Sequence, residues 1–378
     1  MSRRYLLFKK QPTFDISILI TVLLLALYGT MMVFSAGYAY AHAKYGDATF
    51  FMRKQVVWLL LGVILMLTAS RVSPSFFKKA TPYLYGITIF LLVLVLVVGF
   101  VGNGAKRWIS IGPLTIQPSE IAKLTMLMML SYYFSEFEEK ALSDKKKYIF
   151  SHGTLLPGII MLIPILLVML QKHLSCIVIL GALGLIMIVI SGADLRYISA
   201  FCLAGITGIS ALALFTDYTR ERITVWRNPE AYKLTGGWQT LQGLMAIGSG
   251  GLFGTGYTKG VMKHCYVSEP ANDMIFAILC EELGLIGALI AILLFAVLTV
   301  RAIKVSLRAD GVFERLLAFG IAAKLALQAL LNIAVVTNSV PNTGISLPFF
   351  SYGGSSLIMI FVEMGMLLSI SRYAKILK

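Results

Sequence analysis

Residues that could carry acid–base or phosphate chemistry are gathered in four short polar segments of an otherwise apolar chain. The segments are 103–120, 171–175, 220–273 and 337–356. A carboxylate beside apolar residues suits a general base, because partial burial raises its pKa toward neutrality. Asp273 follows Asn272 and precedes the apolar residues 274–276. We expect it to be such a base, and the other role open to it is that of a helix N-cap.

Other motifs limit the chemistry further. The glycine-rich run 248–256 has no preceding strand, so a dinucleotide site is not expected. Its backbone could form an anion-binding nest or a flexible turn between two interfacial helices. The four histidines show no metal-ligand spacing, and no structural metal is expected. Of the four cysteines only Cys265 lies in a clearly polar segment, so no disulfide framework is implied.

The elements that hold these segments are predicted to be membrane-spanning helices. Of the 378 residues 58% are hydrophobic and only 13% are charged, with a mean hydropathy of +0.83. A soluble domain has about 25% charged residues. We predict an all-α, polytopic transmembrane bundle that forms one domain over 1–378, with a large outer loop at about 217–273. The first apolar run is interpreted as a retained span. About ten spans are expected, at 16–35, 55–70, 82–101, 119–135, 154–170, 174–192, 197–216, 274–300, 315–336 and 355–371.

The net charge of +15 is explained by topology, without any nucleic acid. Basic residues are concentrated in the short loops on the side of the two termini, which predicts that both termini are cytoplasmic. The four polar segments then lie on the outer side, and their clustering there predicts a site. The simpler alternative is that outer loops must be polar. A site on that face has no access to cytoplasmic ATP or nucleotide sugars.

The same segments resemble the SEDS (shape, elongation, division and sporulation) family of peptidoglycan glycosyltransferases, which includes FtsW, RodA and SpoVE. The matching stretches, in order along the chain, are 103–108 with 117–123, then Arg222, 228–229, Gln239 and 246–254, then 269–287, and finally 344–356. The runs 252–254 and 281–284 are nearer to the FtsW/SpoVE branch. One departure is Gln171-Lys172-His173, where the family often has Gln-Pro-Asp or Gln-Pro-His. Another is Ala271-Asn272, where it often has His-Thr.

The resemblance implies an inverting hexosyltransferase that polymerises lipid II, its lipid-linked donor, into glycan strands. Asp273 would accept the proton of the attacking sugar hydroxyl as undecaprenyl pyrophosphate leaves. A pyrophosphate needs cations or backbone donors. Arg222 is the favoured cation, followed by Lys106, Arg107, Lys263 and Arg220. Their alternative role is contact with anionic lipid headgroups. The resemblance leaves open whether a divalent cation is weakly bound at the pyrophosphate.

Further site residues are expected on the same basis. Trp108 stacks on a sugar or lipid, or else is an interfacial anchor. Gln239 contacts sugar. The motif before the last span contributes Ser351, Gly353 and Gly354, and Ser351 is not expected to be a nucleophile.

Charged residues within the predicted spans are expected to have partners. Glu120 and Lys123, three residues apart, can share a helix face and have a substrate or architectural role. Glu282 would cross-link helices in support of Asp273. Lys324 and Glu363 are expected to form an internal ion pair.

Two other functions compete with polymerisation. A lipid II flippase would use the same membrane architecture but would need polar groups on both sides of an alternating path. A noncatalytic scaffold would not need Asp273. The family works with a class B penicillin-binding protein, a single-span transpeptidase, and such a partner is expected in addition to lipid II, the nascent glycan strand and membrane lipids.

Overall fold

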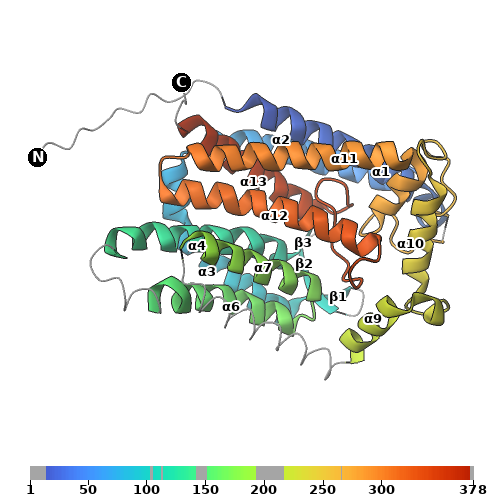
Figure 1. Ribbon diagram of the computed structural model, residues 1–378, viewed down its shortest axis with the longest axis horizontal. Coiled ribbons are helices and arrows are strands. Elements are labelled where there is room, and N and C mark those ends of the chain that lie inside the picture. The colour runs from blue at the N-terminus through green and yellow to red at the C-terminus, as the bar shows by residue number, and fades with distance from the viewer. Residues whose placement is uncertain are drawn as a thin grey trace, which may run out of the picture.

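The protein is a bundle of long helices that run side by side along its longest axis (Figure 1). The computed structural model describes residues 14–102, 105–111, 114–141, 151–192, 217–264 and 266–374. The long helices are α1 (Ile16–Tyr45), α2 (Phe50–Ala69), α3 (Pro74–Val98), α4 (Pro118–Ala141), α6 (Leu156–Leu170), α7 (Leu174–Ile190), α11 (Ile275–Arg308), α12 (Val312–Val336) and α13 (Gly354–Tyr373). The shorter elements are η1 (Ser151–Leu155), α9 (Asp217–Arg227), η2 (Pro229–Tyr232) and α10 (Trp238–Ser249).

The helices confirm a multi-pass membrane protein. Among the described residues, seven are long and apolar enough to cross a membrane: α1, α2, α3, α11, α12, α13 and Gly153–Leu170, which includes α6. The apolar helix α7 is shorter, with 17 residues. Helix α4 has charged residues at both ends. Every predicted span coincides with a helix except 197–216, which lies outside the described residues.

Several helices extend beyond their predicted spans because local signals define their ends. Helix α1 starts after Asp15, whose carboxylate caps the amide of Ser17 at 2.9 Å, and it stops at Gly46 in a left-handed conformation. Helix α3 starts eight residues before the predicted position, with Pro74 in its first turn. Its polar first turns place Lys78 2.8 Å from Glu136 of α4. Hydropathy locates only the apolar part of each helix.

Close packing between the helices depends on small residues. A Cβ at Gly62 of α2 would collide with the ring of Phe361 on α13, and one at Gly365 of α13 would collide with the carbonyl of Met66 on α2. Small residues let helix backbones approach where the solvent is lipid. The pair α2 and α13 therefore packs tightly along its length.

The predicted all-α fold is confirmed, and one small sheet accompanies the helices. Residues before α4 form a small antiparallel sheet of β1 (Phe100–Gly102), β2 (Ala105–Ile111) and β3 (Leu114–Ile116), in the order β1-β2-β3. Trp108 of β2 pairs with Phe100, and Ile109 pairs with Ile116. The segment lies outside the helices, and its alternating residues 108–111 suit a strand. The sheet carries three of the expected site residues, Lys106, Arg107 and Trp108.

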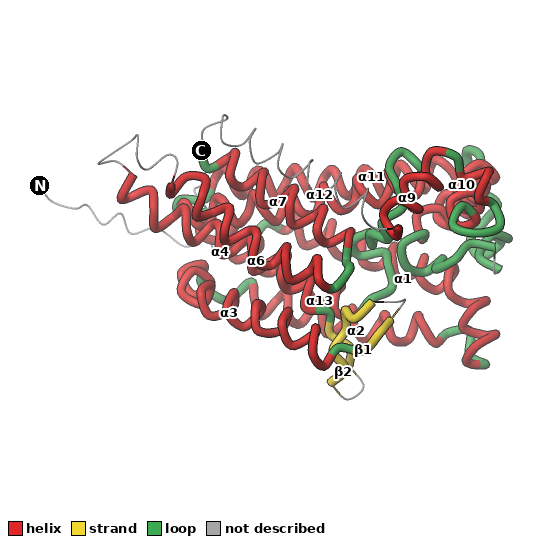
Figure 2. The backbone as a smooth tube through the Cα atoms, turned by 90° about the horizontal axis from the view of Figure 1, so that it is seen from below, coloured by secondary structure: helices red, strands yellow, loops and turns green. Residues whose placement is uncertain are grey.

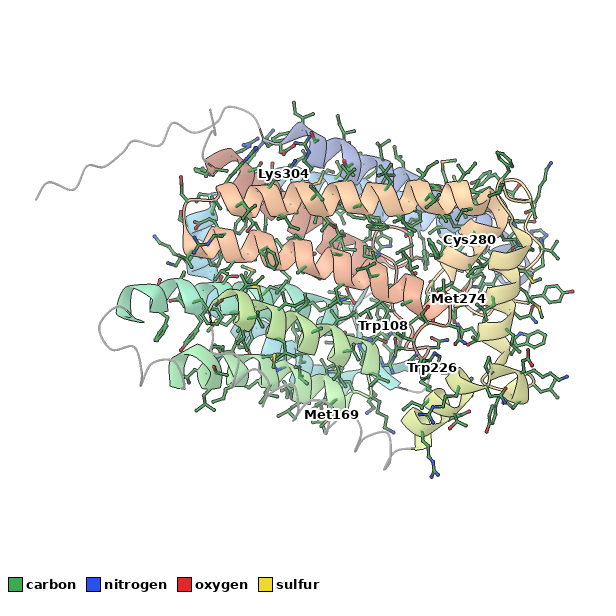
Figure 3. All side chains as sticks on the ribbon, in the orientation of Figure 1. Trp108, Met169, Trp226, Met274, Cys280 and Lys304 are labelled. Carbon is green, nitrogen blue, oxygen red and sulfur yellow. The ribbon has the colours of Figure 1, made fainter. Side chains whose placement is uncertain are left out.

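The two ends of the bundle differ. At one end, the start of α1 meets the end of α13, where the amide of Asp15 donates to Ser371 at 3.2 Å. At the other end α10 crosses the ends of the long helices, with α9 beside it (Figure 1). Most of the loops gather at that second end (Figure 2). Trp226 and Met274 lie toward it, whereas Lys304 lies toward the opposite end of α11 (Figure 3).

Candidate active site

One cavity of about 370 Å³ is lined by residues from all four polar segments. Segments far apart in the sequence therefore meet at the end of the bundle that carries α9 and α10. The lining side chains are largely polar or charged. They include Arg107, Trp108, Gln117, Glu120, Lys123, His173, Ser175, Arg222, Gln239, Glu269, Asn272, Asp273, Gln328, Ser351, Tyr352 and Ser356.

The backbone around Asp273 is clamped from two sides. The hydroxyl of Ser351 donates to the carbonyl of Asn272 at 2.7 Å. The side-chain amide of Asn332, on α12, donates to the carbonyl of Asp273 at 2.8 Å and to that of Ile345 at 2.6 Å. Asn332 is fully buried. These contacts join the start of α11 to the segment before α13 and hold the carboxyl group in place.

The surroundings of Asp273 suit it to exchange a proton near neutral pH. Burial, and then the negative charge of Glu269, raise the pKa of Asp273 to about 7. The charge of Arg222 and a hydrogen bond with Gln239 oppose this shift. One carboxyl oxygen, Oδ1, is buried without a hydrogen-bond partner among the described residues. A group of this kind can take a proton from a hydroxyl that enters the cavity.

Cationic side chains from three elements reach the same cavity. They are Arg107 of β2, Lys123 of α4 and Arg222 of α9. Arg222 donates to the carbonyl of Asn342, and Lys123 forms an ion pair of 2.8 Å with Glu120. Together they make the cavity suitable for an anionic group.

Helix ends add to this positive potential. Helices α4, α7 and α13 begin at the cavity, where Glu120, Ser175 and Ser356 of their first turns line it, and α11 begins just after Asp273. Each helix N-terminus carries roughly half a positive elementary charge. Four such ends converging on one cavity favour a bound anion, and they also favour the ionised form of nearby carboxylates.

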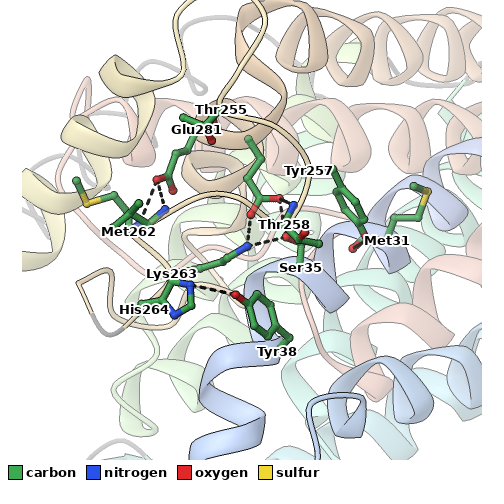
Figure 4. A network of polar contacts seen from close by, with 12 residues as sticks. Met31, Ser35, Tyr38, Thr255, Tyr257, Thr258, Met262, Lys263, His264 and Glu281 are labelled. Carbon is green, nitrogen blue, oxygen red and sulfur yellow. Dashed lines mark hydrogen bonds and ion pairs between the residues drawn. The ribbon is translucent and has the colours of Figure 1, made fainter.

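The long segment before α11, which was predicted to be the outer loop, is anchored by a buried ion pair that does not line the cavity. Lys263 and Glu282, both almost fully buried, bind each other, and Ser35 of α1 donates to Glu282 at 2.5 Å (Figure 4). Lys263 also donates to Ser35 at 3.1 Å. The amide of Thr258 donates to Glu282 at 3.1 Å. The network joins three parts of the chain: α1, α11 and the segment that precedes Asp273.

The glycine-rich run 248–256 makes backbone hydrogen bonds to a break in α11. Gly284 has φ 65°, which interrupts the helix and frees backbone groups on either side. The amide of Thr255 donates to the carbonyl of Glu281 at 2.9 Å, and the amide of Leu285 donates to the carbonyl of Gly251 at 2.9 Å. The run therefore supplies hydrogen-bond partners for backbone groups that the break leaves without partners in the helix. The amides that follow it bind carboxylates of the protein itself, including Val261 to Glu281 at 2.6 Å.

The structure places most of the predicted site residues on the cavity. Those lining it are Asp273, Arg222, Arg107, Trp108, Gln239, Ser351, Gly353, Glu120 and Lys123. Gly354 lines an adjoining, more open cavity of about 590 Å³, which shares Trp108, Asn272, Tyr352 and Gly353 with the first. Lys106 is exposed on β2, outside this lining. The predicted ion pair of Lys324 and Glu363 is confirmed.

Two predicted site residues lie away from this cavity. Lys263 does not line the cavity that holds Asp273, and its ammonium is paired with Glu282, so it is not placed to bind a phosphate there. The predicted cross-link of helices by Glu282 is present, because its carboxylate, on α11, accepts a hydrogen bond from Ser35 of α1. The same carboxylate binds Lys263 and the amide of Thr258. Both residues are close to Asp273 in the sequence, and only the path of the chain separates them from the cavity.

Sequence reasoning did not assign several functional positions. Asn332 and Asn342 are polar residues beside the cavity that no motif had singled out. A buried asparagine within an apolar span was the available signal for Asn332. His173 had been noted only as part of a departure from the family pattern. Among the described residues, no group of three or more His, Cys, Asp and Glu is placed to hold a metal ion.

The fold and the site together define a class of protein. It is a multi-pass membrane protein with a cavity at one end of its bundle, and that cavity holds cationic side chains and a carboxyl group with a raised pKa. The model of the FtsW/RodA/SpoVE family, described as cell cycle proteins, matches residues 15–376. The chain therefore belongs to this family, and the predicted membership is confirmed.

Individual relatives agree with this assignment. The chain is 38% identical over 368 residues to stage V sporulation protein E of Bacillus subtilis, covering 97% of this chain and 99% of the relative. It is 37% identical over 371 residues to a probable peptidoglycan glycosyltransferase FtsW of Geobacter sulfurreducens, covering 97% of each. These relatives belong to the predicted FtsW/SpoVE branch.

Solved structures share the fold over nearly the whole chain. A chain from a peptidoglycan synthase complex that coordinates polymerization and crosslinking superposes with a TM-score of 0.77 and 27% identity, covering 95% of this chain and 98% of that one. The rod shape determining protein RodA of Thermus thermophilus superposes with a TM-score of 0.70 and 26% sequence identity, covering 95% of this chain and 97% of that one.

Proposed function

We propose that this protein is a peptidoglycan glycosyltransferase that polymerises lipid II into glycan strands at the outer face of the bacterial cytoplasmic membrane. The single observation that carries the proposal is Asp273 in a cavity with Arg222, Lys123 and four helix N-termini. This combination offers a base for a hydroxyl proton and a positive site for a pyrophosphate. Family membership, with a relative named as a probable peptidoglycan glycosyltransferase, supports the same reaction.

The reaction assigns a role to each part of the cavity. The acceptor's sugar hydroxyl attacks the anomeric carbon of the donor, and its oxygen forms the new glycosidic bond. The bond from that carbon to the pyrophosphate breaks with inversion, and the lipid pyrophosphate leaves with the electron pair. The hydroxyl proton passes to Asp273. Arg222, Arg107 and Lys123 stabilise the departing negative charge, assisted by the helix ends.

Other groups orient the sugars. Gln239 contacts both Asp273 and Asn342, so it is placed to contact the acceptor sugar beside the base. Trp108 stands between the two adjoining cavities, where an aromatic face can stack on a sugar. Ser351, Gly353 and Gly354 form part of the lining of the two cavities. Glu120 keeps Lys123 in position.

We further propose that both termini are cytoplasmic and that a class B penicillin-binding protein acts with this chain. The first is supported by the distribution of basic residues and by the start of α1 meeting the end of α13 at one end of the bundle. The second is supported by the structural relative that comes from a peptidoglycan synthase complex. Membrane lipids surround the bundle.

The test is polymerisation of purified lipid II by the full chain, with its co-expressed class B partner, comparing wild type with Asp273→Asn. Asparagine keeps the size of the side chain but cannot accept the proton. We expect product formation to fall by at least about a hundredfold, the range for a lost general base, with an unchanged melting temperature. Matched polymerisation by the folded variant would overturn the assignment. Transbilayer movement of lipid II without polymer would indicate the flippase.

A further inference from the structure

His173 is a cavity residue to which the reaction above gives no role. It is the residue before α7, it lines the cavity with Asp273, and only 8% of it is exposed. The imidazole lies on the side of the cavity formed by β2, α4 and α7. The carboxyl group and Arg222 come from the outer segment.

One ring nitrogen of His173 is already engaged by the protein. Its Nδ1 lies 3.2 Å from the hydroxyl of Ser119, in the first turn of α4. The backbone carbonyl of His173 accepts from the amides of Cys176 and Ile177 at 3.2 Å each. The imidazole is therefore fixed, and Nε2 is the nitrogen that remains for a molecule in the cavity.

The turn that carries His173 is held from several directions. Lys172 adopts a left-handed φ of 54°, which side-chain-bearing residues rarely do. Its carbonyl accepts from Arg107 of β2, and Ser175 donates to the carbonyl of Thr343. Gln171 donates to the carbonyl of Leu92 on α3 at 3.2 Å. Such tethering of a strained turn fits a residue that must present one atom accurately.

The surroundings of the imidazole favour its uncharged form. Burial, followed by the positive charge of Arg107, lowers the pKa of His173 to about 3. A neutral imidazole both donates and accepts hydrogen bonds but adds little to the binding of a phosphate. The cavity already has Arg107, Lys123 and Arg222 for that purpose. A neutral partner suits the uncharged hydroxyl and acetamido groups of an amino sugar.

We propose that His173 is a substrate-contacting residue, whose Nε2 hydrogen-bonds an uncharged polar group of the lipid-linked amino sugar while Ser119 holds Nδ1. This inference rests on the proposed function and adds a recognition contact on the α4–α7 side of the cavity. The contact orients the sugar ring relative to Asp273 without altering the charge of the anion site.

Two substitutions of His173 distinguish the contact made by Nδ1 from the one proposed for Nε2. The amide of His173→Asn reaches roughly the position of Nδ1, so it keeps the Ser119 contact and loses the substrate contact. The longer amide of His173→Gln reaches roughly the position of Nε2 and keeps a partner for the substrate. We expect His173→Asn to weaken lipid II binding and raise KM about three- to tenfold, the effect of one lost neutral hydrogen bond. His173→Gln should retain more affinity.

The measurements, all on the full chain with its co-expressed class B partner in nanodiscs, are lipid II affinity, polymerisation rate against lipid II concentration, and melting temperature. The expected result is a raised Kd and KM for His173→Asn at wild-type melting temperature. A folded His173→Asn protein with wild-type Kd and KM, or a larger loss for His173→Gln, would overturn the contact. If wild type binds lipid II but forms no polymer, the proposed function fails while the Kd values still decide on His173. If it binds no lipid II, both fail.

Discussion

At the scale of single residues, the site depends on side chains with opposite electrostatic requirements in one cavity. Asp273 needs a raised pKa to act as a base near neutral pH, whereas a leaving pyrophosphate needs positive charge, which lowers the pKa of a carboxyl group. The balance is set by burial and by Glu269, which outweigh Arg222 and Gln239. His173 remains neutral in the same field because burial and the adjacent Arg107 disfavour its charged form.

The pKa of Asp273 makes activity depend on pH. The base works only when ionised, so kcat/KM for lipid II should fall as the pH drops below about 7. Glu269→Gln removes a negative charge that raises this pKa. The acidic limb of the pH–rate profile should then move to lower pH.

The matched control is the exposed Glu230→Gln, which changes net charge equally on η2. It should leave the profile in place. An acidic limb that Glu269→Gln does not move, or that both variants move alike, would contradict the electrostatic account.

At the scale of elements, the arrangement near the site depends on the broken helix α11. A continuous helix would satisfy its own backbone, but Gly284 interrupts it, and the run 248–256 supplies the missing partners. A Cβ at Gly254 would collide with the carbonyl of Glu282, and one at Gly284 with the backbone of Gly254. The Lys263–Glu282 pair then ties the same region to α1. The start of α11, next to Asp273, is therefore positioned by contacts outside the cavity.

Removing one member of that buried pair should be costly. Lys263→Met leaves the carboxylate of Glu282 buried without its cation, which costs about 3–5 kcal/mol. We expect a clearly lower melting temperature in the same detergent. The double variant Lys263→Met, Glu282→Met should recover much of the loss, because no uncompensated charge remains.

Lys259 provides the control, since it is an exposed lysine of the same segment. Lys259→Met should have a melting temperature close to that of wild type. Equal melting temperatures for Lys263→Met and Lys259→Met would show that the pair contributes little.

At the scale of the whole molecule, the two ends of the bundle differ, because the cavity lies toward only one of them. Helix α1 starts and helix α13 ends at one end, and the sheet, α9, α10 and the cavity lie toward the other (Figure 1). Alternation of spans brings the N-termini of α4, α7, α11 and α13 to the same end. The positive potential of the cavity is thus partly a property of the topology.

The proposed orientation can be tested with single cysteines in a cysteine-free background. Ser268→Cys lies in the exposed outer segment, and Ser75→Cys lies at the start of α3 near the opposite end. A membrane-impermeant maleimide added to intact spheroplasts should label the first only. The second should react after the membrane is permeabilised. The reverse pattern would invert the orientation and place the cavity in the cytoplasm.

Much of the fold could be predicted because its signals are local. Apolar length is sufficient to place a span, and the helices coincide with every prediction within the described residues. The grouping of polar segments also followed from alternation, and it brought Asp273, Arg222, Arg107 and Gln239 to one cavity. The sheet at 100–116 was missed because its strands are only three to seven residues long.

The sequence by itself determined that the chain crosses a membrane many times and which polar stretches share a face, since both depend on hydropathy and order along the chain. Only the tertiary structure decided which charge meets which. Lys263 neutralises Glu282, the tethered turn presents His173 to the cavity, and Asn332 holds the backbone of Asp273. The physical reason is that burial and pairing depend on distances between segments remote in sequence, and those distances exist only once the helices have packed.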